Sequence, residues 1–299
     1  MTAPSSARRR KARWGYAFLA PAAVFLLIFL VLPLCYAVAI SFTNRSAIGL
    51  RPTQYIGTSN YTELLGDSDF RGAILHNLMF TVVIVPLQAA LALGLALLVN
   101  RRLAGHSFFR TAFFIPLAIP LSVAGLIWKL LLDENEGRHG IVTSVVSAVT
   151  FGQLEPHWMV DPHSMQVAVI MISLWSSVGF HMVILLAALQ DVPAELLEAA
   201  MLDGAGAWRR LIAVTIPSIR FPLYFVITTI AVLSFRVFDQ VYVLPSRPGG
   251  PLGATTTLML QIVTSSQRGR MGLAAAASVI LLIVVLLVTL VQRRFQPED

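Results

Sequence analysis

The sequence predicts an all-α integral membrane protein with six transmembrane helices. Of its 299 residues, 57% are hydrophobic and only 12% are charged, whereas a soluble domain has about 25% charged residues. The apolar residues gather in six runs, each close to the roughly 20 residues that a helix needs to cross hydrocarbon. Basic residues gather at the ends of these runs, where they would lie beside lipid headgroups.

The predicted spans follow a basic N-terminal segment, residues 1–16. The first run is too long for the core of a signal peptide, which spans about 7–15 residues, so we interpret it as a retained span. The polar segment after it is expected to hold a short helix near Tyr61 to Leu65. The spans form one domain, residues 17–292, followed by a tail, residues 293–299. The predicted spans are residues 17–40, 78–99, 111–132, 165–189, 221–244 and 271–291.

Charge predicts the orientation of the spans. The segments assigned to the inside hold about twice as many Lys and Arg residues as those assigned to the outside, which favours cytoplasmic N and C termini. The second and third spans then form a hairpin with a short basic turn inside, and the polar loops at about 133–163 and 245–270 lie outside. The net charge of +7 does not indicate nucleic-acid binding, because the basic residues are scattered along the chain.

The cytoplasmic segment between the fourth and fifth spans, residues 191–220, is the one long polar interruption that itself looks helical. Ala194 to Leu202 are good helix formers, and Gly204 is typical of a left-handed helix end. Pro217 and Pro222 are expected to break the path into the fifth span. Short helices between spans are commonly interfacial connectors, so the residues alone leave a passive connector and a functional element both open.

Motifs of soluble enzymes are absent from the sequence. It holds no phosphate loop of the Walker type, so the chain is not expected to bind or hydrolyse ATP. The six histidines are dispersed, none at the spacing of a His-Glu-x-x-His zinc site, and the single cysteine, Cys35, cannot form an intrachain disulfide. No nucleophile elbow of the Gly-x-Ser-x-Gly type occurs. The chain is therefore expected to be non-catalytic, with no metal and no cofactor of its own.

Ionisable residues inside apolar runs are more informative, since charges in hydrocarbon tend to face a bundle interior or an aqueous path. Arg236 and Asp239 could pair along one helix face or extend toward the outer interface. Lys129 and Arg110 lie at span ends and are interpreted as headgroup anchors. His181 is expected to hydrogen-bond between helices rather than to relay protons. A proton-coupled carrier would be expected to hold several aligned carboxylates or histidines, and a single Arg–Asp pair does not meet that expectation.

The cytoplasmic segment resembles the signature loop of the integral-membrane subunits of bacterial ATP-binding-cassette importers. That loop has a Glu-Ala-Ala triplet, a following Gly, and a later Ile-x-Leu-Pro, for which this chain has Val214-x-Ile216-Pro217. The resemblance implies that the short helix fits a groove of a cytosolic ATPase and couples its motion to transport. The coupling residues that it implies are Glu198, Ala199, Ala200, Asp203, Gly204 and Pro217.

Further matches run in order along about 280 residues and resemble carbohydrate-type permeases such as the maltose and glycerol-phosphate systems. The segment 245–248 departs from their usual Thr-x-Gly. The matching segments include His76-Asn77-Leu78, Phe109-Arg110-Thr111, Phe114-Ile115-Pro116, Gly179-Phe180 and Phe238-Asp239-Gln240.

This resemblance implies a type I ABC importer permease fold in the bacterial cytoplasmic membrane. It also implies alternating access, a second permease subunit, a cytosolic ATPase dimer that holds ATP and Mg²⁺, and an extracytoplasmic substrate-binding lipoprotein. The expected cargo is a sugar, with glycerol phosphate or an amino sugar as the alternative. An ion-coupled secondary carrier, which usually shows an inverted repeat, and a scaffold without transport are the other classes. The implied substrate path holds Trp175, Ser177, Phe180, Ser234, Arg236 and Asp239.

Overall fold

The computed structural model describes residues 16, 18–47, 49, 52–100, 106–132 and 140–296, and its regular elements there are helices. The one strand-like pairing in these ranges is an isolated bridge between Thr43 and Tyr55. This confirms the predicted all-α class. The predicted N-terminal segment lies outside the described residues apart from Tyr16, as do residues 297–299 of the predicted tail.

Five helices in the described ranges are long and apolar enough to cross a membrane, and a bent pair of helices supplies a sixth candidate. The prediction of a six-span protein therefore agrees with the structure. The five are Phe18–Ser41, which ends in the π-helix η1 (Leu27–Val31) and α2 (Leu32–Ser41); α4 (Ser68–Asn100); α8 (Pro162–Gln190); Arg220–Val243, comprising α12 (Arg220–Ser234) and α13 (Asp239–Val243); and α15 (Met271–Arg293).

The third predicted span is not one straight helix. It consists of α5 (His106–Ala118) and α6 (Leu121–Leu132), which meet at an angle of 103°. Pro116 lies inside α5 and Pro120 lies between the two helices, and each proline removes a backbone donor that a continuous helix would need. The prediction of a single run over 111–132 was wrong in this respect.

The second span also differs, because α4 begins at Ser68, well before the predicted residue 78. Its start is fixed by Asp67, whose side chain accepts from the Asp69 backbone N–H at 2.9 Å. The predicted short helix near Tyr61 to Leu65 is confirmed as α3 (Ser59–Gly66). The two segments predicted as outer loops each contain a helix, α7 (Ile141–Val149) and α14 (Leu258–Gln267), which hydropathy alone did not reveal.

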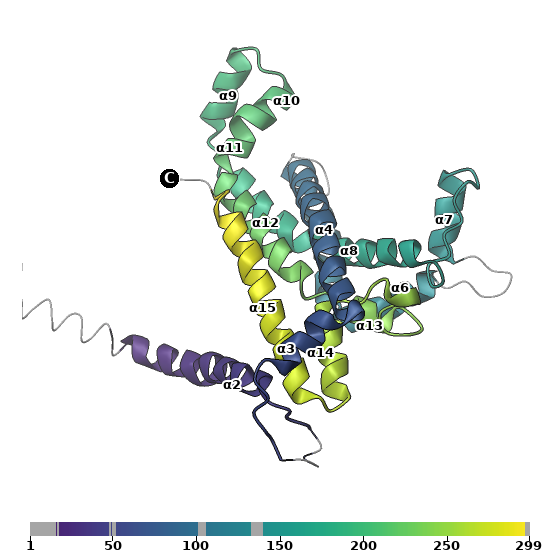
Figure 1. Ribbon diagram of the computed structural model, residues 1–299. Coiled ribbons are helices and arrows are strands. Elements are labelled where there is room, and N and C mark those ends of the chain that lie inside the picture. The colour runs from purple at the N-terminus through teal and green to yellow at the C-terminus, as the bar shows by residue number, and fades with distance from the viewer. Residues whose placement is uncertain are drawn as a thin grey trace, which may run out of the picture.

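Helix α8 lies at the centre of the packing, beside α4, α5 and α12 (Figure 1). In its most apolar 18-residue stretch 61% of the residues are buried, whereas in the corresponding stretch of the first span none is. The first span leads away from the bundle and meets α15 near the N-terminal end of α15 (Figure 1). Fully buried side chains of the main core include Phe80, Ile172, Met182, Leu185 and Ile230.

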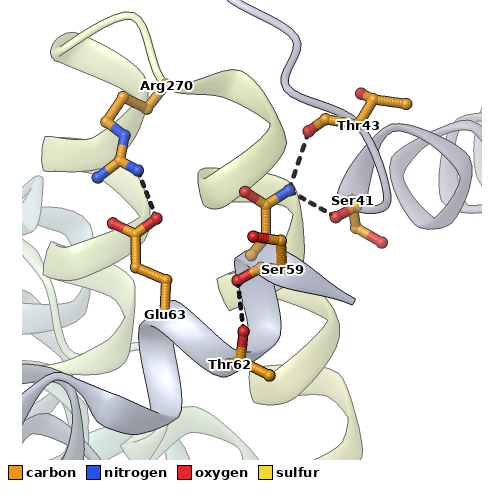
Figure 2. A network of polar contacts seen from close by, with 7 residues as sticks. Ser41, Thr43, Ser59, Thr62, Glu63 and Arg270 are labelled. Carbon is orange, nitrogen blue, oxygen red and sulfur yellow. Dashed lines mark hydrogen bonds and ion pairs between the residues drawn. The ribbon is translucent and has the colours of Figure 1, made fainter. Parts of the chain in front are cut away.

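A polar clamp joins the end of the first span to α3 and to the start of α15. The Asn60 side-chain amide donates to the backbone oxygens of Ser41 and Thr43, at 2.7 and 2.9 Å, and Arg270 donates to Glu63 at 2.7 Å. Figure 2 shows Ser41, Thr43, Glu63 and Arg270 in this arrangement. Gly272 completes the clamp, since a Cβ there would overlap the carbonyl oxygen of Thr43. These contacts hold one end of a span that the bundle otherwise leaves exposed.

Candidate functional site

The predicted cytoplasmic helix is present as α9 (Ala194–Leu202), with Pro193 as its N-cap residue. It ends as the sequence predicts, with Gly204 at φ +75°. The backbone N–H of Ala205 donates to the carbonyl of Ala200 at 2.9 Å, and that of Gly204 donates to Met201 at 3.0 Å. This pair of bonds is a Schellman motif, which turns the chain sharply and satisfies the last carbonyl groups of the helix.

Helix α9 projects beyond the ends of α12 and α15, together with α10 (Ala207–Arg210) (Figure 1). None of its residues is buried. Leu202 is 90% exposed and Met201 is 50% exposed, beside the exposed Glu198. A protruding helix that presents large apolar side chains next to a carboxylate has the character of a protein-docking element. Of the six predicted coupling residues, Ala200 is half-buried, and Glu198, Ala199, Asp203, Gly204 and Pro217 are exposed.

The sequence predicted that Pro217 and Pro222 break the helical path from α10 into the fifth span, but both prolines lie within helices. After α10 the chain forms the π-helix η2 (Leu211–Thr215) and α11 (Ile216–Ser218), with Pro217 in the first turn of α11. The wider π-turn accommodates a residue that has no N–H. The helix is interrupted only at the buried Ile219, where φ is −101° and ψ is 16°. A nearly continuous helical path therefore runs from α10 into α12.

A second site is a cavity of about 270 Å³ among α4, α6, α8, α12 and α13, called the polar cavity because most of its lining residues are polar. Four of the six predicted substrate-path residues line it: Ser177, Ser234, Arg236 and Asp239. The other two predicted residues are not among the lining residues. Trp175 packs edge-to-face on Trp128, with ring centroids 5.8 Å apart, and the exposed Phe180 has its ring edge-to-face with His181.

Polar side chains from three spans meet at the cavity wall. The side-chain amide of Gln88 on α4 lies 2.6 Å from Ser177 Oγ and 3.0 Å from His181 Nδ1 on α8. Thr81 on α4 hydrogen-bonds Ser234 on α12 at 2.6 Å. The prediction that His181 hydrogen-bonds between helices is confirmed. Sequence reasoning missed Gln88, Ser173, Ser176 and Gln240 as lining residues, although a glutamine inside an apolar run is itself a signal of a polar interior.

Arg236 and Asp239 do not pair along one helix face, contrary to one of the two predictions made for them. The helix of the fifth span is interrupted between Ser234 and Asp239, and Arg236 lies in this interruption whereas Asp239 begins α13. The Asp239 carboxylate accepts from Ser122 Oγ at 2.7 Å instead, and no ion pair joins Arg236 to Asp239 in the described part of the chain. Arg236 remains exposed at the cavity.

Comparisons with known proteins agree with this architecture. The chain is 30% identical over 256 residues to the trehalose/maltose transport system permease MalF of Thermococcus litoralis, covering 86% of this chain and 84% of that protein. It is 30% identical over 263 residues to the lactose transport system permease LacF of Rhizobium radiobacter, covering 87% and 86%. A chain from the crystal structure of a bacterial alginate ABC transporter, in complex with an alginate-bound periplasmic protein, has the same fold, with a TM-score of 0.80, 21% identity and 97% of both chains covered.

The family model for the inner membrane component of binding-protein-dependent transport systems matches residues 88–298. The matched region contains α9, the cavity-lining part of α8 and both halves of the broken fifth span. The chain is thus a multi-pass membrane protein, and it belongs to the family of inner membrane components of binding-protein-dependent transport systems.

Proposed function

We propose that this chain is a permease subunit of an ATP-driven, binding-protein-dependent sugar importer, and that α9 couples it to a cytosolic ATPase. One observation carries the coupling: the helical path that follows α9 leads through η2 and α11 into α12, whose far end lines the polar cavity. A displacement of α9 by a partner can therefore reach the cavity along one nearly continuous helical path. Coupling of this kind needs an element with two discrete arrangements, and the interruption of the helix between Ser234 and Asp239 is the joint that can supply them.

The chain itself is proposed to be non-catalytic. ATP and Mg²⁺ belong to the partner ATPase dimer, a second permease completes the pore, and an extracytoplasmic lipoprotein delivers the cargo. Glu198, Ala199 and Ala200 would contact the ATPase, with Asp203 and Gly204 shaping the turn behind them. In this proposal α9, the N terminus and the C terminus all lie in the cytoplasm, as the distribution of basic residues predicts.

Sugar is the cargo that the cavity chemistry favours. Its wall presents hydroxyl and amide groups from Ser176, Ser177, Ser234 and Gln240 beside apolar residues, which suits a ring with polar edges and apolar faces. The similar MalF and LacF proteins are named for trehalose, maltose and lactose transport. One observation favours the runner-up, a phosphorylated or otherwise acidic solute: the exposed guanidinium of Arg236 at the same cavity.

The test is reconstitution of the whole importer, with both permeases, the ATPase and the binding protein, in proteoliposomes. Glu198→Lys and Gly204→Pro are expected to leave membrane insertion and assembly intact but to abolish substrate-stimulated ATP hydrolysis and uptake. Glu155→Lys makes the same charge reversal at an exposed loop position far along the chain from α9, and it is expected to leave both activities unchanged. Transport that persists in both α9 variants would overturn the coupling proposal.

A further inference from the structure

The exposed face of helix α7 is apolar. Its side chains recur at the helical spacing of three and four residues, and they are Ile141, Ser144, Val145, Ala148 and Val149. Ile141, Val145 and Val149 are 66%, 57% and 72% exposed. The single polar group on this face is one serine hydroxyl, so the face is poorly suited to contact with water.

The opposite face of α7 is attached to the protein. Val142 and Val146 pack on the main core, and the buried Thr143 accepts a hydrogen bond from the Trp158 indole N–H at 2.8 Å. A helix that is apolar on both faces normally lies in the core of a protein or in a membrane. Helix α7 has nine residues, whereas a span needs roughly 20, so it cannot cross the bilayer.

The end of α7 displays one more apolar side chain. The backbone N–H groups of Gly152 and Phe151 donate to the carbonyls of Ser147 and Ala148, at 2.7 and 3.5 Å, in the same Schellman pattern that ends α9. The left-handed residue of this pattern is Gly204 after α9, but here it is Phe151, at φ +53°. The left-handed conformation disfavours a phenylalanine, and this ring is 94% exposed. A strained and exposed apolar side chain points to a contact outside the chain.

Lipid is the contact that the surroundings favour. Residues 140–154 contain no Asp, Glu, Lys, Arg or His, whereas an interface with another protein has a polar rim. Helix α7 packs on α6, which belongs to a candidate membrane span and whose Leu126 and Leu130 are 54% and 75% exposed. The lipid contact of the third span therefore adjoins α7. The helix also lies at the edge of the molecule, apart from α12 and α15 (Figure 1).

We propose that α7 and Phe151 form an interfacial anchor, in which the exposed face of α7 lies in the headgroup and acyl boundary of the bilayer and the Phe151 ring inserts beside it. The segment predicted as an outer loop, at about 133–163, thus contains a membrane-bound element. The bond between Trp158 and Thr143 ties the anchor to the start of α8 at Pro162. Because α8 lines the polar cavity, the bilayer holds one end of a cavity-lining helix. The anchor depends on the chain's place in a membrane and not on the proposed transport function.

The test is site-directed spin labelling of the assembled importer, without its binding protein, in lipid nanodiscs. Nitroxides are attached one at a time at Ile141→Cys, Val145→Cys and Val149→Cys. The background is Cys35→Ser, which removes the single cysteine of the chain, and the cysteines of the partner subunits are replaced as well. Electron paramagnetic resonance then compares collisions of each label with oxygen, which concentrates in lipid, and with a nickel chelate, which stays in water.

The three labels are expected to collide more with oxygen than with the nickel chelate. Their oxygen-to-nickel ratio should match that of Leu130→Cys on the third span and should be severalfold higher than that of Leu252→Cys, which is 97% exposed in the loop after the fifth span. Val142→Cys on the packed face of α7 is the matched control. It should collide little with either reagent, because protein covers it.

Two results would overturn the inference. A predominance of nickel collisions at the three positions would show that this face of α7 lies in water. Weak collisions with both reagents would show that another protein, such as the second permease, covers it. A cysteine variant that fails to assemble is replaced by Ala148→Cys, a smaller change on the same exposed face, and the same two results decide.

Discussion

Ser122 and Asp239 meet across two broken spans. Ser122 lies in the first turn of α6, directly after the 103° bend of the third span, and Asp239 begins α13, directly after the break in the fifth span. The Ser122 hydroxyl donates to the Asp239 carboxylate at 2.7 Å. The residue before Ser122, Leu121, lines the polar cavity, as does Asp239 itself. The two breaks are therefore joined at the edge of the proposed substrate site.

Ser122→Ala is expected to loosen this junction. It removes a hydrogen bond to a charged acceptor, and because Ser122 is exposed the loss should be near 1 kcal/mol, at the low end for such bonds. Thermal unfolding of the purified complex should show a drop of a few degrees, and Ser122→Thr, which retains the hydroxyl, should show none. A melting temperature that Ser122→Ala leaves unchanged would mean that the bond does not hold the breaks together.

Gly179→Ala is expected to be strongly destabilising. A Cβ at this position in α8 would overlap the backbone carbonyl of Phe113 in α5, so the two helices would have to separate, and overpacking of this kind costs about 1–3 kcal/mol. Gly94→Ala on α4 is the matched control, because nothing lies within 4 Å of its added Cβ. It should be neutral or stabilising by up to about 1 kcal/mol through helix propensity. The yield of folded protein in detergent and its melting temperature measure both effects, and equal behaviour of the two variants would contradict this packing.

In the polar clamp, the neutral side-chain amide of Asn60 is expected to stabilise the fold more than the ion pair between Glu63 and Arg270 does. Asn60 is buried and donates to two backbone oxygens, so Asn60→Leu should cost about 1–3 kcal/mol by leaving buried acceptors unpaired. The side chains of the ion pair are 49% and 50% exposed, so Glu63→Gln should cost at most about 1 kcal/mol. Chemical unfolding of the two variants compares these costs, and a larger loss for Glu63→Gln would reverse the order.

The same ion pair predicts a weak pH dependence. The hydrogen bond from Arg270 lowers the pKa of Glu63 below its ordinary value of 4.5. A carboxylate with a lowered pKa contributes its stabilisation above the pKa of the unfolded chain and loses it as the pH falls through the folded-state value. The difference in stability between the wild type and Glu63→Gln should therefore be present at neutral pH and be lost progressively as the pH falls below 4.5. A difference that persists at pH 3 would show that Glu63 acts by packing instead.

Sequence patterns predicted those helices that are determined by residues close together in the sequence. The apolar runs located α8 and α15 to within three residues at each end, and the helix formers before Gly204 located α9. The break between Ser234 and Asp239 had no such signal, because no proline or glycine occurs there and hydropathy is the same for a continuous and an interrupted helix. The bond from Ser122, more than a hundred residues away in sequence, is a tertiary contact, and so are the Gln88 contacts that build the cavity wall.

The same substitution at Gly204 and at Gly206 tests whether the Schellman turn after α9 matters for coupling to the ATPase. Gly204 has φ +75°, a conformation that disfavours any side chain, whereas Gly206 is the N-cap of α10 at φ −64°, where serine is a preferred residue. No other atom lies within 4 Å of a Cβ at either position, so only backbone conformation separates them. Gly204→Ser should strain the Schellman turn by about 1 kcal/mol and reduce substrate-stimulated ATP hydrolysis by the assembled importer, while Gly206→Ser should leave it unchanged or stabilise α10. If the two variants hydrolyse ATP at equal rates, the geometry of the turn after α9 does not govern coupling, because the strain of Gly204→Ser is confined to that turn.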